Sequence, residues 1–349
     1  MLRRLIVALL SAPLVLALGA SLLGQAARGE SEAERARGPL GSGAAVVFAF
    51  GADVHFEGVL ASKLATSART VLAPIAPTLG RADLAVVNLE TAVTNRGVAV
   101  PKEFTFRAPP AAFAALRGGS VDVASMANNH GLDFGEQGLR DSLAAAKRYR
   151  FPVVGIGTNA KRAYAPYRTT VNGQRIAVIG ATQVLDDELV SAWTAGPGKP
   201  GLASAKDVPW LLEAVREARR TSDTVVVFLH WGVELMACPS SDQRKLARQL
   251  VRAGADIVTG GHAHRPQGAG RMGRSFVSYG LGNFVWYGTS ELSTRTGVLF
   301  VTATGRRIDG YSWVPARIVG GVPRPLTGAP RKQAVASWRS LRSCAGLDP

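Results

Sequence analysis

The chain has 349 residues, of which 47% are hydrophobic and 19% are charged. This length can hold one large domain or two ordinary ones, and this composition excludes disorder as a description of the whole chain. The formal net charge of +16 predicts a surface that attracts anionic polymers or anionic membranes, unless the many arginines only reflect genome composition. No stretch interleaves basic and aromatic residues, so we predict no nucleic-acid partner.

Residues 1–27 predict a signal peptide or a membrane anchor. A basic start precedes an apolar run over residues 5–23, and small residues at 24–26 suit signal peptidase. The apolar run also reaches the lower limit for a helix that crosses a bilayer, so cleavage and retention both stay open. Either outcome predicts an exported protein, extracellular or at the cell surface. Membrane contact is then expected only through an uncleaved segment 5–23.

After a polar linker over residues 28–43, apolar runs of strand length alternate with helical patterns. The expected strands cover residues 44–50, 84–88, 121–126, 176–181, 224–230, 256–260, 276–281 and 297–303. The expected helices cover residues 59–79, 109–117, 135–149, 207–220 and 240–253. Ser240 or Ser241 is the expected N-cap of the last helix. This alternation predicts an α/β protein with one layered domain over residues 44–321, followed by a polar, proline-rich tail over 322–349.

The chain has two cysteines, Cys238 and Cys344. In an oxidising compartment an even number of cysteines favours a disulfide. Such a bond would fasten the C-terminal tail to the domain. The alternative is two independent free thiols.

Residues that can bind metals follow five of the expected strands. They are Asp53 and His55, Glu90, Asn129 and His130, His230, and His262 and His264. All five histidines of the chain lie in these loops. In open α/β folds, sites assemble in the loops beyond the carboxyl ends of the strands. Imidazole nitrogens combined with carboxylate oxygens favour Zn, Mn or Fe, so the pattern predicts a metal site.

Two of these residues suit a site with two metal ions. The Glu90 carboxylate can bridge two cations, and the Asn129 amide oxygen can complete a coordination sphere. Two ions roughly 3.5–4 Å apart would hold a phosphoryl or carbonyl oxygen and activate a bound water. Each residue also has a structural alternative: Asp53 can cap a helix, Glu90 can pair with an arginine, and Asn129 can occupy a left-handed turn.

Six motifs in this order resemble the CapA family of capsule or poly-γ-glutamate synthesis proteins. They are GADVH, ADLAVVNLE, NNHGLDFG, HWGVE, GGHAH and YGLGNF. The resemblance runs from about Val46 to Pro315, and the CapA family is itself similar to the calcineurin-like metallophosphoesterases. It implies a four-layer α/β/β/α sandwich with two divalent metal ions, which could be Mn, Zn or Fe.

The resemblance also implies a role for each motif residue. The first metal would bind Asp53, His55 and His264. The second metal would bind Asn129, His230 and His262, and Glu90 would bridge the two. His130 would be the general acid or would stabilise the transition state. Three further residues are candidates for binding substrate or orienting a ligand, with an ordinary structural or surface role as the alternative: Asn128, Glu234 and Asn283.

The chain departs from the broader phosphoesterases in two places. Those enzymes carry Gly-Asp where this chain has Asn88-Leu89-Glu90, so the bridging side chain is one methylene longer. They also place an acid directly after the Asn-His pair, whereas Gly131 follows here and the nearest acid is Asp133. Both departures match CapA proteins and favour a different reaction in the same pocket, such as amide hydrolysis or acyl transfer.

These observations together predict an exported, metal-dependent CapA-like protein. It would act in the synthesis, processing or anchoring of an anionic surface polymer, poly-γ-glutamate or capsule, through metal-hydroxide hydrolysis or acyl transfer. Its expected partners are the polymer and a membrane-bound polymer synthase. Two alternatives stay open: a metallophosphoesterase that acts on phosphate esters or teichoic acid, and a non-catalytic polymer-binding accessory of a membrane synthase.

Overall fold

The computed structural model describes residues 43–349. The predicted signal peptide or anchor over residues 1–27 lies outside the described residues, as does the predicted linker apart from residue 43. Among the helices of residues 43–349, none is long and apolar enough to cross a membrane.

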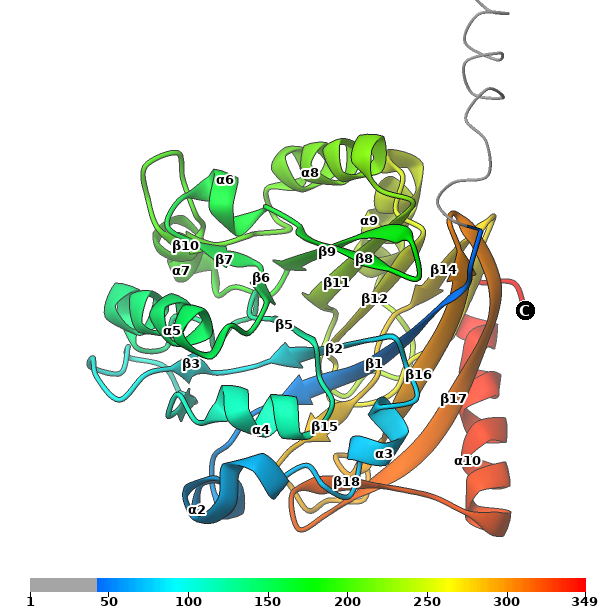
Figure 1. Cartoon of the computed structure of the whole chain (residues 1–349), viewed down its shortest axis with the longest axis horizontal. Helices are drawn as coiled ribbons and strands as arrows, with labels where there is room; N and C mark the ends of the chain where they lie inside the picture. The colour runs from blue at the N-terminus through cyan, green and yellow to red at the C-terminus, as the bar shows by residue number, and fades with distance from the viewer. Residues whose placement is uncertain (1–42) are drawn as a thin grey trace, which may run out of the picture. The chain divides into compact units, whose positions relative to one another are not determined.

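Two large sheets form the centre of the domain (Figure 1). The first runs in the order β18 (Val322–Pro325), β17 (Arg307–Val319), β16 (Arg295–Thr304), β1 (Val46–Val54), β2 (Leu84–Leu89), β5 (Val123–Ser125) and β6 (Val153–Val154), and β15 (Asn283–Val285) pairs with β1. The second runs in the order β13 (Ala269–Met272), β14 (Ser275–Ser278), β12 (Ile257–His262), β11 (Thr224–Trp231), β9 (Gln174–Thr182) and β8 (Tyr167–Val171). Two small sheets pair β3 (Ala92–Val93) with β4 (Arg107–Ala108), and β7 (Ile156–Gly157) with β10 (Gly201–Leu202).

Strand side chains alternate between two apolar layers, because successive residues of a strand point to opposite faces. Phe48 and Phe50 of β1 belong to the core between the sheets, which they share with Phe228 of β11. Ala49 belongs instead to the core between the first sheet and its helices. Each central strand is therefore buried on both faces.

Helices cover the outer face of each sheet. The first sheet packs against α2 (Val59–Ser67), η1 (Ala68–Thr70), α3 (Ala76–Leu79), α4 (Ala112–Gly118) and α5 (Gly135–Tyr149). The second packs against α6 (Ala160–Ala163), α8 (Val208–Thr221) and α9 (Ser241–Ala253). The short helix α7 (Asp187–Trp193) places Trp193 in the core of the first sheet. The layers follow one another as helix, sheet, sheet and helix (Figure 1). The predicted four-layer α/β/β/α sandwich is confirmed.

All eight expected strands are present, and four of the five expected helices are present as single helices; α6, α7 and α10 (Gly328–Ser340) were not expected. The helix expected over residues 59–79 is divided into α2, η1 and α3. Pro74 has no amide hydrogen and disfavours helical geometry in the residue before it. The N-cap of α9 is Ser240, as expected. Its hydroxyl accepts from the Gln243 backbone at 3.1 Å, and the Gln243 side chain accepts from the Ser240 backbone at 2.9 Å.

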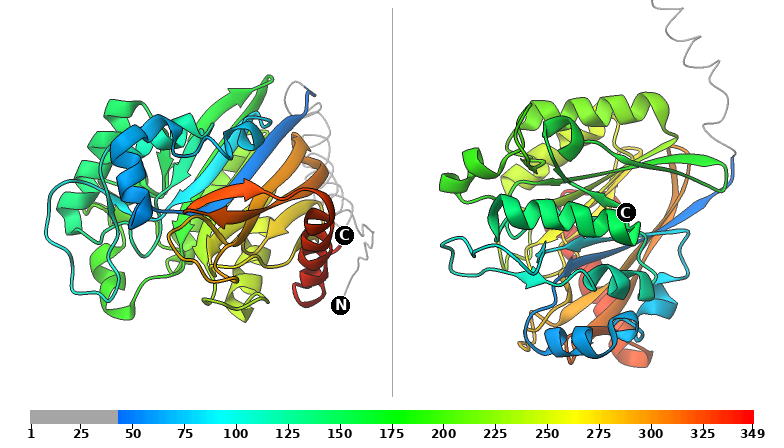
Figure 2. Two further views of the ribbon diagram at one scale, coloured as in Figure 1. Left: turned by 90° about the horizontal axis from the view of Figure 1, so that it is seen from below. Right: turned by 60° about the vertical axis from the view of Figure 1, so that its left-hand side comes forward.

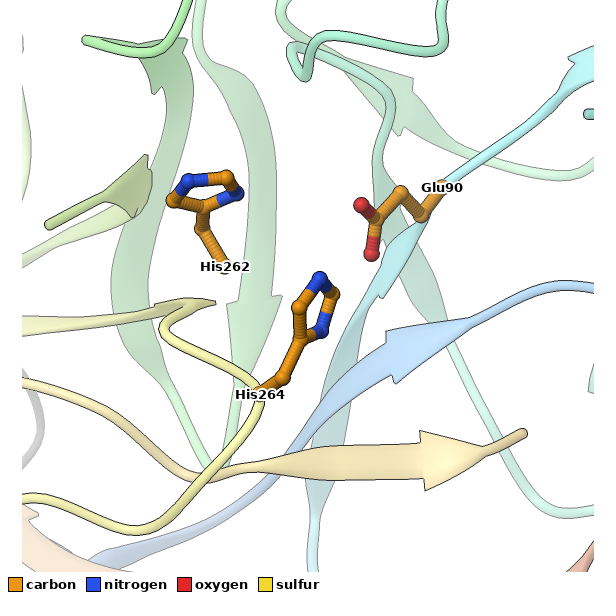
Figure 3. Close-up of side chains that lie close together, drawn as sticks. All are labelled: Glu90, His262 and His264. Atoms are coloured by element: carbon orange, nitrogen blue, oxygen red, sulfur yellow. The ribbon is translucent and has the colours of Figure 1, made fainter. Parts of the chain in front are cut away.

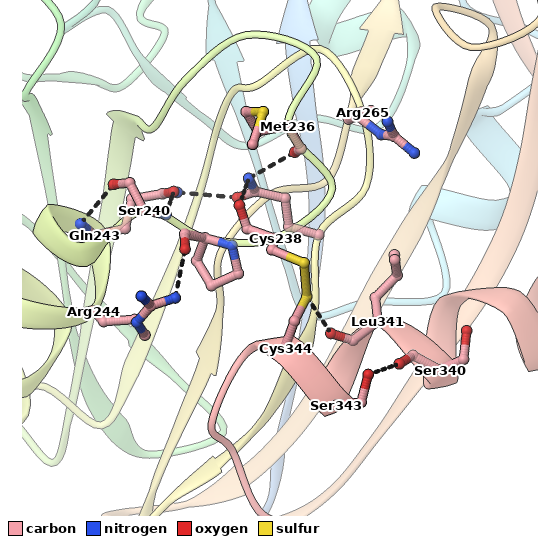
Figure 4. Close-up of a disulfide and its surroundings, with 12 residues drawn as sticks. Met236, Cys238, Ser240, Gln243, Arg244, Arg265, Ser340, Leu341, Ser343 and Cys344 are labelled. Carbon is pink, nitrogen blue, oxygen red and sulfur yellow. Dashed lines mark hydrogen bonds between the residues drawn. A yellow bond between two sulfur atoms is a disulfide. The ribbon is translucent and has the colours of Figure 1, made fainter.

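The C-terminal residues 322–349, expected as a tail, pack on the domain. They form β18, which pairs with β17, then α10 (Gly328–Ser340) and η2 (Leu341–Cys344). Figure 2 shows α10, in red, beside β17 of the first sheet. The predicted disulfide between Cys238 and Cys344 is present, with Cα atoms 5.6 Å apart (Figure 4). It joins the loop after β11 to η2.

Candidate metal centre

The site lies where strands of the two sheets end. From the first sheet, β1 carries Asp53 and the residue after β2 is Glu90; from the second, β11 carries His230 and β12 ends at His262. β1, β2 and β5 run parallel in the first sheet, as do β9, β11 and β12 in the second. The carboxyl ends of parallel strands meet at one edge, so these residues come together there although they lie far apart in the sequence.

Glu90 is the centre of this group. Its carboxylate lies within 4.8 Å of the ligand atoms of His262 and His264 in one cluster, and of Asp53 and His230 in a second. Figure 3 shows the Glu90 carboxylate facing the His262 and His264 rings. Both Glu90 oxygens are buried and have no hydrogen-bond partner among residues 43–349. Burial raises the pKa of Glu90 well above its usual range, and repulsion from Asp53 adds to this rise.

An unpartnered buried carboxylate is costly in free energy unless a cation or a donor neutralises it. Here the surrounding groups are imidazoles and a second carboxylate, which are themselves metal ligands. The donor set of this pocket therefore fits divalent cations. Glu90 belongs to both clusters, which is what a shared ligand between two ions would require.

Asp53 is fixed by two hydrogen bonds from the chain. Its Oδ1 accepts from Asn88 Nδ2 at 2.9 Å, and its Oδ2 accepts from the His262 backbone amide at 2.9 Å. The same carboxylate lies 3.6 Å from His264 Nδ1 and 3.8 Å from His230 Nδ1. Asp53 is thus held between histidines of the second sheet.

The loop after β12 brings two histidines close to Asp53 by an unusual backbone path. His262 has a φ of 86° and His264 a φ of 53°, and such left-handed values are uncommon for residues other than glycine. Strained backbone of this kind clusters at functional sites. A Cβ on Gly261 would overlap the Asp53 carboxylate, so only glycine allows this close approach.

His230 and Asn129 point their ligand atoms at the same place. Asn129 Oδ1 is 2.8 Å from His230 Nε2, and Glu90 Oε1 is 3.5 Å from that nitrogen. On the other side of the ring, Asn88 Nδ2 lies 3.1 Å from His230 Nδ1. The ring is thus held between Asn88 and Asn129, with Nε2 on the side of Asn129 and Glu90.

His55 lies at the edge of the group, outside both clusters. Its Nδ1 accepts from the Glu57 backbone at 3.2 Å. Three aromatic rings surround it, with centroid distances of 4.7 Å to Phe106, 4.2 Å to Trp286 and 4.7 Å to Tyr287. The structure therefore places His55 in an aromatic wall beside the site, and its predicted ligand role stays a prediction.

Burial keeps most of these imidazoles neutral. It lowers the pKa of His55 and of His262 to about 3, and it lowers the pKa of His230 well below its usual value. His264 differs: burial acts downward, but Asp53 and Glu234 outweigh it, so its pKa is raised. Neutral imidazole is the form that binds metal ions.

His130 adjoins the clusters and is oriented by a carboxylate. Its Nδ1–H donates to Asp133 Oδ2 at 2.6 Å, and its Nε2 is 3.9 Å from Glu90 Oε1. Its ring stacks on Phe106 with centroids 4.0 Å apart. Burial lowers the pKa of His130, and Asp133 opposes that shift. The arrangement suits a side chain that exchanges a proton at Nε2.

Comparison with known proteins gives the family. The family described as bacterial capsule synthesis protein PGA_cap matches residues 46–287. The chain belongs to this family. The resemblance to CapA proteins is thereby confirmed.

Relatives of this CapA-family chain carry matching names. A capsule biosynthesis protein CapA from Bacillus anthracis is 34% identical over 63% of this chain and 54% of that protein. A PGA biosynthesis protein CapA from Bacillus subtilis is 30% identical over 74% of this chain and 68% of that protein. A probable polyglutamine synthesis accessory protein from Mycobacterium tuberculosis is 30% identical over 58% and 55%. The chain thus matches little more than half the length of two of these relatives.

A solved structure supports the fold alone. A hypothetical protein from Thermus thermophilus superposes with a TM-score of 0.50 and 17% identity, over 78% of this chain and 99% of that chain. The identity is too low for that protein to say anything about the reaction.

Asn128 holds two loops of the CapA-family site together. Its Nδ2 donates to Asn88 Oδ1 at 3.0 Å and to the Leu89 carbonyl at 2.9 Å. Its Oδ1 accepts from the His130 backbone at 3.0 Å. The side chain is fully buried and its polar atoms face these partners, so it positions the loops.

Asn283 and Glu234 both approach His264. Asn283 Oδ1 accepts from His264 Nδ1 at 2.7 Å, and its Nδ2 donates to the Ser293 carbonyl at 2.9 Å. This contact orients the ring and leaves Nε2 available. Glu234 Oε1 lies 3.8 Å from that Nε2, while its side chain is 59% exposed. Glu234 is thus at the mouth of the site.

Three residues of the site received no role from the sequence. Lys102 Nζ donates to Asp133 Oδ1 at 2.8 Å and to the Asn129 carbonyl. Phe106 donates its amide to Asp133 Oδ2 at 2.7 Å and stacks on two histidines. Trp286 packs edge-on against His55. No motif marks Lys102 or Phe106, so only the folded contacts reveal them.

Proposed function

We propose that this protein is a metal-dependent CapA-family protein that acts on an anionic surface polymer, poly-γ-glutamate or capsule. The observation that carries the metal part is Glu90, whose buried carboxylate lacks a partner among the described residues and belongs to two ligand clusters. The polymer part is supported by the family and by the names of its relatives. The high positive charge suits such a polymer.

The proposed ligands are the seven residues assigned through the resemblance: Asp53, His55, Glu90, Asn129, His230, His262 and His264. Bound divalent ions would act as Lewis acids on a carbonyl or phosphoryl oxygen and would lower the pKa of a water. The clusters group Asp53 with His230 and His262 with His264, whereas the resemblance separates both pairs. Both divisions share Glu90, so Glu90 as common ligand is the best-supported part of the assignment.

His130 is the proposed proton donor to the leaving group. Its Nδ1–H is held by Asp133, so the proton it gives up is the one at Nε2, on the side that faces Glu90. Burial lowers the pKa of His130, and the Asp133 carboxylate opposes that shift and so favours the imidazolium that would donate the proton. Phe106 and Trp286 exclude water from the edge of the pocket.

Export is part of the proposal. The basic and apolar pattern of residues 1–27 supports a signal peptide, with segment 5–23 as an anchor if it is not cleaved. The Cys238–Cys344 disulfide suits an oxidising compartment. We expect a membrane-bound polymer synthase as the partner at the cell surface.

The experiment measures the metal content of the purified protein and then its action on three substrates: γ-glutamyl polymer, a phosphodiester and a phosphomonoester. We expect bound divalent metal in the parent and little in an Asp53→Ala/His264→Ala variant. Glu217→Ala, on an exposed position of α8, is the control and should keep its metal. A parent without bound metal, or a site variant with unchanged metal, would contradict the metal centre.

A second candidate function is a metallophosphoesterase. The sequence places Gly131 where those enzymes have an acid, but the structure brings Asp133 within 2.6 Å of His130 Nδ1. Asp133 therefore supplies beside His130 the carboxylate that the sequence lacks directly after it. Phosphatase turnover that disappears in His130→Ala would favour this candidate. Polymer binding without turnover on any substrate would favour a non-catalytic accessory role.

A further inference from the structure

A separate cavity of about 310 Å³ lies between α10 and the strands β16 and β17. Trp313 of β17 and Trp338 of α10 line it, and their rings stack 11° from parallel with centroids 5.4 Å apart. Leu326 and Leu341 also line it. The inner wall of this cavity is therefore apolar and offers flat aromatic surface.

The rim of the cavity carries three arginines and one carboxylate: Arg265, Arg295, Arg317 and Glu291. Arg295 pairs with Glu291, four residues earlier in the chain, and this contact keeps the pKa of Glu291 below its usual value. Glu291 therefore stays ionised, and one positive charge is matched. Two guanidinium groups of the rim remain in excess.

The cavity is connected to the metal centre through two chain segments. Arg265 directly follows His264, and Figure 4 shows Arg265 beside Met236 above the disulfide. On the other side, Asn283 bonds both to His264 and to the Ser293 carbonyl. Ser293 lies in the stretch 291–295 that contributes three residues to the cavity.

We propose that this cavity is a second binding site for a carboxylate-bearing chain, a short segment of γ-glutamyl polymer held beside the metal centre. The inference rests on the proposed function. Apart from Arg265 and Pro266, the lining residues lie beyond the family match, which ends at residue 287. The family assignment therefore does not account for this cavity.

The chemistry of a γ-glutamyl chain matches the cavity on both sides. Each unit carries one carboxylate and two methylenes. Guanidinium groups bind carboxylates in a planar, two-bonded geometry. The methylenes can lie on the faces of Trp313 and Trp338 and bury apolar area there. The volume is at the lower end for ligand pockets, so it suits a short segment and not a whole folded partner.

The test is calorimetric titration of the purified full-length protein with a synthetic γ-glutamyl hexamer. Arg295→Gln/Arg317→Gln should weaken binding by about tenfold or more, because two charged contacts are lost. Arg331→Gln/Arg339→Gln removes the same charge from exposed positions of α10 outside the cavity. This control should stay within about threefold of the parent, since distant surface charges are screened.

A second variant tests the cavity without removing the hydrogen bonds that Arg317 makes to its own loop. Arg317 also bonds to the Glu291 carbonyl and to Thr294, so its loss could disturb a loop. Ala334→Trp leaves the charge unchanged and fills the cavity from α10. It should abolish hexamer binding while the thermal unfolding midpoint stays close to that of the parent. Full hexamer affinity in Ala334→Trp would overturn the proposal, as would equal losses in the two arginine variants.

Failure of the proposed function gives a different pattern. If the hexamer binds the parent and is lost only in Asp53→Ala/His264→Ala, the polymer function stands and the cavity inference is overturned. Glutarate, a single dicarboxylate too short to span both sites, is titrated into the parent and into Ala334→Trp, so that binding lost in the variant reports on the cavity. A parent that binds glutarate but no hexamer, with glutarate binding lost in Ala334→Trp, would support a carboxylate site and overturn the polymer function.

Discussion

At the scale of single residues, Glu90 should make the stability of the metal-free protein depend on pH. Its pKa is raised in the folded state, so the folded chain holds this proton more tightly than the unfolded chain does. Stability of the metal-free protein should therefore fall as the pH rises from the usual glutamate value of 4.5 towards the raised value. Divalent metal should reverse this loss, because it binds the ionised carboxylate.

Replacing Glu90 by Gln should separate these two effects. In chelator, Glu90→Gln should gain stability over the parent as the pH rises above the usual glutamate value, because the variant has no carboxylate to ionise in the buried site. In the presence of metal the parent should gain more than the variant. Thermal unfolding by circular dichroism, with and without chelator, measures both differences. A variant that is less stable than the parent in chelator would show that the charge is compensated in another way.

His130 should matter for turnover and not for metal binding. If the protein turns over any of the three substrates, His130→Gln should lower kcat by about 10²- to 10⁴-fold, the usual contribution of a positioned acid. Metal content should stay unchanged, because His130 lies outside both ligand clusters. Asp133→Asn should lower kcat in the same direction and move its alkaline pH limb to lower pH, because the imidazolium loses the carboxylate that favours it. Loss of metal in His130→Gln would instead place His130 among the ligands.

At the scale of elements, the loop after β12 shapes the site through Gly261. A methyl group there would overlap the Asp53 carboxylate and push it away from His262 and His264. We expect Gly261→Ala to fold and to bind metal at least about tenfold more weakly, in line with the effect of disturbing ligand orientation. Gly198→Ala is the matched control, because its Cβ would meet no atom within 4 Å. Equal metal affinity in both variants would mean that the loop adjusts.

The disulfide should stabilise the packing of α10. It joins residues 106 positions apart, and closing so long a loop restricts the unfolded chain, which stabilises proteins typically by about 2–4 kcal/mol. Reduction should therefore lower the free energy of unfolding by roughly that amount, as measured by urea denaturation. In Cys238→Ser/Cys344→Ser the reductant should have no further effect. If the reductant left the parent unchanged as well, the bond would contribute nothing to stability.

The elements that the sequence did not predict share a physical feature. The missed strand β17 alternates irregularly between buried and exposed positions, and among the described residues of α10 only Trp338 is buried. Neither segment has the continuous apolar run that marked β1 or the helical period that marked α9. In the site, residue types alone indicated the metal-binding motifs. The grouping around Glu90, and the contacts of Lys102 and Phe106, depend on tertiary packing that no local pattern encodes.

At the scale of the whole molecule, the net charge of +16 has two explanations, polymer attraction and genome composition. Salt separates them, because the screening length falls from about 10 Å at 0.1 M to about 3 Å at 1 M. If the charge serves the polymer, affinity for high-molecular-weight poly-γ-glutamate should fall about tenfold or more between roughly 0.05 M and 0.5 M NaCl. Metal content should not change, because most of the ligands are buried and little screened. Uncharged polyglutamine of similar length is the control and should show no salt dependence. Polymer affinity that is independent of salt would leave genome composition as the explanation of the charge. Polymer binding would then rest on local contacts, such as those in the cavity between α10 and the strands β16 and β17.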